Sequence, residues 1–233
     1  ELIEKLENEQ TPTAKMRAVV WANTYRLLDP YFVSETGRGL AVGMKILVQV
    51  SVSFHSLYGF SLVITDINPT YTVGEEEQRR IKIIRQLEED GVMDLNKEIP
   101  MPLVPQRVAI ISSSTAAGYQ DFMQQLHENP YGIAFQTQLF PAAMQGPEVE
   151  GTVVAQLDEI YKHENDFDVV VIIRGGGARA DLAWFDSYAI ATNITQFPLP
   201  VITGIGHDKD QSIIDMVANM SLKTPTAVAE FLV

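Results

Sequence analysis

The sequence predicts an α/β fold in which a parallel sheet with flanking helices follows a smaller β domain. The main observation is an alternation: between residues 106 and 219, short β-branched runs alternate with helix-type stretches. Strands that alternate with helices imply a parallel sheet joined by right-handed crossovers. Two further observations support this division: residues 1–70 are rich in strand-type patterns, and a proline-interrupted stretch separates the two parts.

The composition is that of a globular protein. The chain has 233 residues, enough for one large or two smaller domains, and is 46% hydrophobic and 20% charged. It contains no cysteine, which excludes disulfides and cysteine-based zinc sites. No apolar run approaches the ~18 residues of a membrane span, and the charged start of the chain is unlike a signal peptide. We therefore expect a cytoplasmic protein with no membrane partner.

The net charge of −13 speaks against a nucleic-acid partner, because phosphate binding requires lysine and arginine. Net charge describes solubility and steering rather than the lining of one cleft, so the objection is limited. The acidic residues also cluster, and the clusters at 75–77, 88–90 and 148–150 are typical of solvated helix faces.

Residues 1–72 form the expected β domain. Its strands are predicted at 17–21, 44–54 and 60–67. We expect a hairpin turn at 56–59, a short helix within 23–39, and either a strand with its hairpin or a helix at 1–9. Some aromatic residues here belong either to the core, the more common case, or to a surface that stacks on bases: Trp21, Phe54, Tyr58 and Tyr71.

Residues 73–105 are expected to be a helix and a linker. A stripe of apolar residues that includes Ile81, Ile84 and Leu87 predicts a helix over 74–91, which Gly91 ends. Prolines then interrupt the chain at positions 100, 102 and 105, as is typical of a connector.

Residues 106–233 form the expected α/β domain. Its strands are predicted at 107–111, 133–140, 169–173 and 199–203. Its helices are predicted at 116–127, 148–164, 181–193 and 210–219. Ligands of such sheets bind beyond the carboxyl ends of the strands. The loops after the third and fourth strands are therefore the candidate site.

The loop after the third strand joins an arginine to three glycines. Gly175, Gly176 and Gly177 permit positive φ and a close approach of backbone N–H groups to an anion, although a plain tight turn explains them as well. Arg174, at the end of a buried strand, must pair with an anion or with a carboxylate of the protein. An anion site and an internal salt bridge both remain open.

The loop after the fourth strand has a similar form. Gly206 and His207 follow the strand, and an imidazole works as acid or base near neutral pH. Asp210 could orient His207 or bind a metal. The plainer alternatives are a helix cap for His207 and favourable interaction with the helix dipole for Asp210.

Further polar groups follow the first strand. Ser113, Ser114 and Thr115 offer hydroxyls and N–H groups to a phosphate, or simply cap the next helix. Asp121 lies within that helix, where aspartate has poor propensity. The residues alone do not decide whether it faces the site or the solvent.

Longer motifs then join these pieces. They are RVAIISSSTAA at 107–117 with Asp121, the segment 141–146, RGGG at 174–177 with Asp181 and Phe185, GHDKD at 206–210 and TPTAVAE at 224–230. In this order and spacing, they resemble the large subunit of bacterial exodeoxyribonuclease VII. The resemblance implies that 1–72 is a partial OB-fold nucleic-acid-binding domain, and 106–233 an α/β nuclease domain. It also implies that the chain is a fragment, without the first OB strands and the long helical region of the family.

The resemblance implies an enzyme that degrades single-stranded DNA from either end to short oligonucleotides. It implies a partnership with several copies of a small subunit, bound through the absent helical region. The essential residues would be Asp121, Arg174, His207 and Asp210. No cofactor would be strictly required, with Mg²⁺ optional at Asp121 and Asp210. Phosphate and DNA contacts would come from Ser113, Ser114, Thr115, Gly175, Gly176, Gly177 and Gly206.

The chain departs from the family pattern in places that put substrate contacts in question. Ile173 stands where the family usually has glycine, Ala178 where it has serine, and Ala180 where it has glutamate. The expected tryptophan is displaced to Trp184. Two other functions remain open: a non-catalytic module that binds single-stranded DNA, and an α/β enzyme that acts on a phosphorylated metabolite. Cleavage would exclude the first, and stabilisation by sugar phosphates would favour the second.

Overall fold

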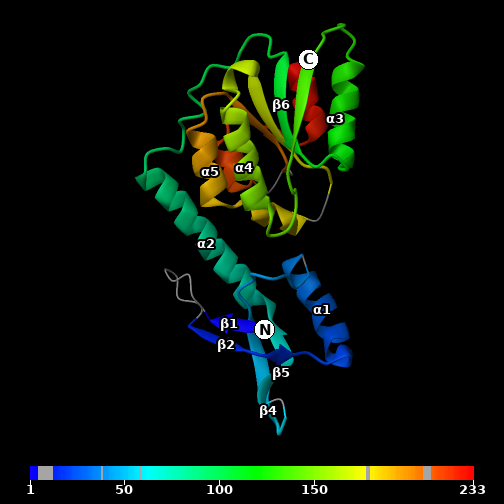
Figure 1. Cartoon of the computed structure of the whole chain (residues 1–233), viewed down its shortest axis with the longest axis vertical. Helices are drawn as coiled ribbons and strands as arrows, with labels where there is room; N and C mark the ends of the chain where they lie inside the picture. The colour runs from blue at the N-terminus through cyan, green and yellow to red at the C-terminus, as the bar shows by residue number, and fades with distance from the viewer. Residues whose placement is uncertain (5–12, 38, 58, 177–178, 207–210) are drawn as a thin grey trace. The chain divides into compact units, whose positions relative to one another are not determined.

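The computed structural model describes the chain except for residues 5–12, 38, 58, 177–178 and 207–210, and except for the side chains of residues 179 and 180. The described residues form two compact units, Glu1–Glu77 and Gln78–Val233. The division falls inside helix α2, Pro69–Glu89 (Figure 1). The three domain ranges expected from the sequence stay a prediction, as does the OB-fold.

The described part of the first unit contains small sheets. Strand β1, Leu2–Glu4, pairs antiparallel with β2, Ala14–Met16, so the described start of the chain is a strand and not a helix. In the second sheet the order is β3-β5-β4. These strands are Ala18–Val19 (β3), Leu47–His55 (β4) and Gly59–Asn68 (β5).

The predicted hairpin between β4 and β5 is confirmed. The two strands run antiparallel and are in register up to the pair His55 and Gly59. The expected short helix is α1, Ala22–Thr36, which is longer than predicted. It ends at Gly37, whose φ of 75° lies in the left-handed region that favours glycine.

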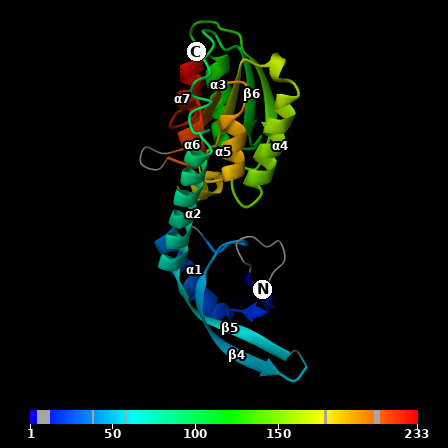
Figure 2. The same ribbon diagram turned by 90° about the vertical axis from the view of Figure 1, so that its left-hand side faces the viewer.

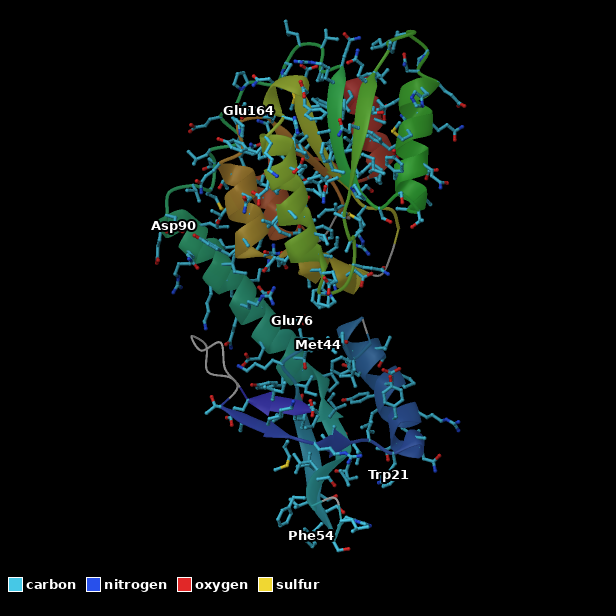
Figure 3. The ribbon with its side chains drawn as sticks, in the orientation of Figure 1. Trp21, Met44, Phe54, Glu76, Asp90 and Glu164 are labelled. Atoms are coloured by element: carbon cyan, nitrogen blue, oxygen red, sulfur yellow. The ribbon has the colours of Figure 1, made fainter. Side chains whose placement is uncertain are left out.

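The core interpretation of the aromatic residues is wrong for two of them. The exposed fraction is 66% for Trp21 and 65% for Phe54, and both side chains are labelled in Figure 3. Phe54 pairs with Phe60, and their ring centroids are 5.0 Å apart. Tyr71 is half-buried, and Tyr58 lies outside the described residues.

Helix α2, predicted over 74–91, begins earlier, at Pro69, and ends at Glu89, before the predicted Gly91 stop. Pro69 occupies its first turn, where the missing N–H of proline costs nothing, and the Tyr71 N–H donates to Asn68 Oδ1 at 3.2 Å. Gly91, with φ of 67°, follows its end. Leu87 is fully buried in the core of the second unit.

The described part of the second unit is built on a five-stranded sheet in the order β10-β9-β8-β6-β7, and all its pairings are parallel. This confirms the predicted fold class. The strands are β6, Arg107–Ser112; β7, Gln136–Pro141; β8, Val169–Ile173; β9, Val201–Gly204; and β10, Met220–Ser221. Strand β10 was not predicted, because two residues carry no periodicity.

Helices cover both faces of this sheet (Figures 1 and 2). Helices α3, Ala117–His127, and α7, Pro225–Leu232, pack on the face that Val108 and Ile110 of β6 share. On the other face, with Ala109 and Ile111, lie α4, α5 and α6. These are Val149–Tyr161, Tyr188–Thr195 and Ile213–Val217. The alternation along β6 is the one expected of a strand buried on both faces.

Three predicted helices have different limits in the structure. The helix expected at 148–164 ends at Tyr161, before the 3₁₀ turn η1, Glu164–Asp166. The helix expected at 181–193 is broken into the 3₁₀ segment η2, Arg179–Phe185, and α5. Ser187 causes the break, because its backbone is extended and its hydroxyl accepts from the Ile190 N–H at 3.2 Å as an N-cap.

The third of these helices is short. Of residues 210–219, α6 takes Ile213–Val217, which follow a capping box formed by Ser212 and Asp215. Among the residues that the structure describes, no helix is both long and apolar enough to cross a membrane.

Candidate active site

The strand order places a switch point between β6 and β8. From β6 the chain crosses to β7 on one side, and from β8 it crosses to β9 on the other. Open α/β sheets bind ligands at the carboxyl ends of the strands at such a point. The Ser112 hydroxyl donates to the Ile173 carbonyl at 2.8 Å and ties these two strand ends together. Arg174 follows directly.

A cavity of about 480 Å³ lies at this switch point, within the size range of small-ligand sites. Its walls come from the loops after β6, β7 and β8. They comprise Ser113, Thr115, Ala116, Ala117, Ala143, Met144, Gln145, Arg174, Gly175 and Gly176. The site predicted from the strand ends therefore coincides with a cavity, and the loop after β7 adds a wall to it.

Arg174 is held by its backbone and by a carboxylate. Its N–H donates to the Gly204 carbonyl at 3.3 Å, and its guanidinium Nη2 lies 2.9 Å from Asp181 Oδ2. Only 5% of the Arg174 side chain is exposed. Burial lowers the pKa of Arg174, and the Asp181 charge opposes that shift. An arginine keeps its charge at neutral pH, so a buried cation borders the cavity.

The internal salt bridge expected as the plainer alternative for Arg174 is therefore present, and it lies in the wall of the cavity. The two interpretations are compatible, because a guanidinium has five N–H donors in a fixed fork. Asp181 holds one nitrogen of that fork, Nη2, and the Arg174 residue lines the cavity.

The glycines after Arg174 serve close packing. The interpretation that they provide positive φ is wrong for Gly175 and Gly176, which do not adopt it. A Cβ on Gly175 would lie 2.8 Å from the backbone N of Gly118, and a Cβ on Gly118 would lie 2.5 Å from Gly175 Cα. Strand β8 thus ends against the start of α3 at a distance that only glycine allows. Gly177 lies outside the described residues.

The hydroxyls after β6 do not cap the next helix. The N-cap residue of α3 is Ala116, which makes no side-chain cap hydrogen bond. The hydroxyls of Ser113 and Thr115 lie 3.1 Å apart and line the cavity. Ser114 is exposed and is not among the described lining residues. The geometry favours a ligand-facing role for two of the three predicted hydroxyls.

Comparison with known proteins shows the family of the chain. The family model "Exonuclease VII, large subunit" matches residues 92–233. The chain is 36% identical over 224 residues to the exodeoxyribonuclease 7 large subunit of Deinococcus radiodurans, covering 94% of this chain and 54% of that protein. The chain belongs to the exonuclease VII large-subunit family.

Other members of the exonuclease VII family match over a similar extent. The large subunit of Lacticaseibacillus casei is 34% identical over 218 residues, with 93% of this chain and 46% of that protein covered. For Synechococcus sp. the identity is 32% over 219 residues, with 92% and 52% covered. The chain spans about half the length of the curated relatives it matches.

Asp121, which the resemblance to exonuclease VII singles out, lies away from the Arg174 cavity. It is exposed on α3 and lines a separate hollow of about 1160 Å³ with Thr226 and Glu230 of α7. It is not among the described residues of the Arg174 cavity. The structure does not bring Asp121 and Arg174 into one cavity, and a catalytic role for Asp121 stays a prediction.

His207 and Asp210 lie outside the described residues. Gly206, which precedes them, is half-buried and lies just beyond the register pair of Ile173 and Gly204. The described part of this loop therefore ends two residues after the strand end that pairs with Ile173. Their roles in an exonuclease VII site stay predictions.

The optional Mg²⁺ at Asp121 and Asp210 stays a prediction, because Asp210 lies outside the described residues. Within the part of the chain that the structure describes, no group of three or more His, Asp or Glu residues could hold a metal ion. Asp121 lines a different hollow from Arg174, and Asp210 is not described.

Two features of the candidate site were not predicted from the sequence. Asp181 was noted within a motif, but its pairing with Arg174 was not; a carboxylate just after a buried cationic loop was the available signal. The wall formed by Ala143, Met144 and Gln145 was also not foreseen. Of the departures from the family, Ile173 is a fully buried strand residue, and Trp184 packs at the edge of the core.

Proposed function

We propose that this chain is the part of an exonuclease VII large subunit that hydrolyses phosphodiester bonds of single-stranded DNA. Products would be short oligonucleotides released from either end. The observation that carries the proposal is Arg174, a buried cation oriented by Asp181 in the wall of a cavity at the switch point. Membership of the exonuclease VII large-subunit family supports this assignment. Because the chain spans about half the length of its relatives, the activity is proposed for the whole protein.

A phosphodiester is an anion that gains charge on its oxygens in the transition state. A preoriented guanidinium in a site of low water content stabilises that charge. The hydroxyls of Ser113 and Thr115, in the same wall, would donate to a non-bridging oxygen of the phosphate. The cavity would thus hold one phosphate group, with Arg174 as its main partner.

In the proposed reaction, water loses a proton as its oxygen forms a bond to phosphorus, the P–O bond to one nucleoside oxygen breaks, and that leaving oxygen receives a proton. His207 would transfer the proton as general acid or base, since imidazole titrates near neutral pH. Asp210 and Asp121 would orient reacting groups. The end of β9 at Gly204, whose carbonyl accepts from the Arg174 N–H at 3.3 Å, supports a role for the residues that follow it.

The first unit would bind the strand upstream of cleavage as a partial OB-fold. Its exposed aromatic side chains, Trp21 and Phe54, suit stacking on bases, which contributes about 1–3 kcal/mol per base. A complex with the small subunit follows from the large-subunit family. We place the small-subunit contact in the helical region that the resemblance assigns to the family.

The test is cleavage of a labelled single-stranded oligonucleotide by the full-length protein assembled with its small subunit, in Mg²⁺ and in chelator. We expect Arg174→Ala to lower kcat by roughly 100- to 1000-fold, the usual loss for one oxyanion donor. Arg107→Ala is the matched control, because Arg107 lies at the amino end of β6, away from the cavity. This variant should cleave at the wild-type rate. His207→Ala should abolish cleavage.

Binding of the oligonucleotide without cleavage in any metal condition would favour a DNA-binding module. Thermal stabilisation by sugar phosphates together with indifference to oligonucleotides would favour a metabolite enzyme. Cleavage by Arg174→Ala at the wild-type rate would remove Arg174 from the site and overturn the proposal.

A further inference from the structure

The cavity that contains Arg174 has two unlike sides, both within the second unit. The loops after β6 and β8 supply two hydroxyl residues, Ser113 and Thr115, and the cation of Arg174. The loop after β7 supplies an alanine, Met144 and Gln145, and the start of α3 adds two more alanines. Among the described lining residues no carboxylate occurs, although the chain has a net charge of −13. One side therefore suits an anion, and the other suits an uncharged group.

The loop after β7 is anchored on both sides of Gln145. Before it, the Ala142 N–H donates to the Ser112 carbonyl at 3.0 Å, and Met144 packs in the core with 7% of its surface exposed. After it, Gly146 has a φ of 82°, in the left-handed region that favours glycine, and the chain then enters α4. The backbone of Gln145 is therefore held in one place at the cavity.

The carboxamide of Gln145 can meet a ligand. The residue is exposed, and no described residue forms a hydrogen bond with its side chain. A carboxamide offers two N–H donors and one carbonyl acceptor without carrying a charge. The edge of an unpaired nucleobase presents donors and acceptors side by side, which such a group can match.

The size of the cavity points to more than a phosphate. Its volume is about 480 Å³, in the range of sites that hold a whole small molecule. A phosphate group bound at Arg174 would leave the side formed by the β7 loop unfilled. In a single strand, a sugar and a base adjoin each phosphate, so the chemistry of the two sides matches the two parts of a nucleotide.

We propose that Met144 and Gln145 form a nucleoside subsite, which binds the sugar and base next to the phosphate held by Arg174. Met144 would pack on the apolar face of the base, as thioethers do against aromatic rings. The Gln145 carboxamide would form hydrogen bonds with the base edge. The inference rests on the proposed function, because it takes the phosphate at Arg174 to belong to a DNA strand.

The first test is binding without cleavage. Calorimetry measures Kd for inorganic phosphate and for deoxyadenosine monophosphate, with the full-length protein assembled with its small subunit. Gln145→Ala should weaken binding of the nucleotide by roughly 3- to 10-fold, the effect of one or two hydrogen bonds, and leave phosphate binding unchanged. Arg174→Ala should weaken both. Gln136, an exposed glutamine at the start of β7 and not a described residue of the cavity, provides the matched control. Gln136→Ala should change neither constant.

A second variant tests the carboxamide itself. Gln145→Met keeps the length of the side chain but removes its donors and acceptor, so it should bind the nucleotide as weakly as Gln145→Ala. Full nucleotide affinity in Gln145→Met and Gln145→Ala would overturn the subsite. An equal loss for phosphate and nucleotide would also overturn it, because Gln145 would then contact the phosphate.

Cleavage gives a second readout in the same assembled protein. A labelled oligonucleotide carries one abasic sugar, whose position is scanned along the strand. In the wild type, cleavage beside the abasic sugar should be roughly 3- to 10-fold slower than at flanking bonds. In Gln145→Ala this difference should shrink, because the same contact is already missing. An undiminished difference would overturn the inference. Failure of the wild type to cleave would contradict the proposed function, and the binding comparison would still decide the subsite.

Discussion

The parallel sheet has an amino edge, where its strands begin, and a carboxyl edge, where they end. The two edges carry the same residue types in different surroundings. At the amino edge, Asp168 of the η1–β8 loop accepts from the Gln106 N–H at 3.0 Å and the Arg107 N–H at 2.8 Å, and pairs with the Arg107 guanidinium at 2.6 Å. At the carboxyl edge, Asp181 pairs with Arg174 at 2.9 Å. Both edges therefore have an arginine–aspartate pair beside a buried strand.

The surroundings of the two pairs differ. The amino-edge pair joins β6 to β8 and lies partly in water, with 44% of the Arg107 side chain exposed. The carboxyl-edge pair is buried and forms part of a cavity wall. Burial raises the free energy of a charged side chain. Such buried charges occur in sites where the charge is positioned to interact with a ligand. The comparison teaches that the end of the strand on which a charged pair lies, more than its residue types, indicates its role.

The amino edge is also closed by the connector. Asn96, fully buried, donates to the Leu199 carbonyl at 3.0 Å and accepts from the Val201 N–H at 2.9 Å. The stretch expected to be a plain linker therefore satisfies the backbone at the start of β9. Polar groups at this edge complete the fold, as buried backbone groups require.

The largest expected effect on stability is at the carboxyl edge, where β8 meets α3. Gly175→Ala places a Cβ 2.8 Å from the Gly118 backbone, which cannot yield without moving α3. We expect a loss of about 3 kcal/mol in the free energy of unfolding, as for overpacked cores. Thermal unfolding checks this value. Gly176→Ala is the control, since its Cβ would meet nothing within 4 Å, and an equal loss there would contradict the packing explanation.

The second effect tests whether Arg174 depends on its carboxylate. Asp181→Ala leaves a buried guanidinium without this partner, and we expect a loss of about 2 kcal/mol in the free energy of unfolding. Because the fork loses its orientation, kcat for single-stranded DNA should fall by roughly 10-fold or more. Asp181→Asn, which keeps an acceptor, should lose less of both. Full activity in Asp181→Ala would show that the pair is structural, like that at the amino edge.

Several features of the carboxyl edge could be predicted from the sequence. Hydrophobic periodicity, and the glycine and proline positions that interrupt it, are local signals. The buried strand β8, with Val169 to Ile173 all apolar, was recognisable, as was the glycine loop after it. The direction of the sheet followed from alternation with helices, so Arg174 could be placed at the ligand-binding edge. These features need no knowledge of which distant residues meet.

Features that depend on distant contacts could not be predicted. Gly118 and Gly175 are far apart in the chain, and only the fold shows that each is needed for the other to approach. The apolar pattern of a helix continues across Ser187, so the break before this residue could not be predicted. The break depends on one hydrogen bond of the Ser187 hydroxyl, which caps a new helix. The sequence also could not show which hollow Asp121 lines, because this depends on how α3 packs against the sheet and α7.

A smaller effect is expected at the amino edge. Asp168→Ala removes acceptors for Gln106 and Arg107, but water reaches these groups and replaces part of the interaction. We expect a loss of about 1 kcal/mol in the free energy of unfolding and no change in kcat. Calorimetry together with an activity assay checks both. A loss of activity at full stability would break the distinction between the edges.

The smallest effect is the pH dependence of stability, which should have opposite sign at Asp168 and Asp186. Burial would raise the pKa of Asp168, but hydrogen bonds from Arg107 and the Gln106 N–H outweigh it and lower the pKa. Its stabilisation is therefore present above the unfolded pKa of about 3.9 and lost as the pH falls through the folded pKa.

For Asp186 burial raises the folded pKa, so its contribution to stability is present below the unfolded value of about 3.9 and is lost as the pH rises through the folded pKa. Thermal unfolding between pH 3 and pH 7 (about the range where carboxylates titrate) should show this directly. Asp168→Asn should be less stable than the wild type at neutral pH, and the difference should vanish in acid. Asp186→Asn should equal or exceed the wild type at neutral pH, and that gain should vanish in acid. Parallel curves for the two variants would mean that Asp186, like Asp168, is stabilised in its charged form, and would contradict the opposite sign expected for the two carboxylates.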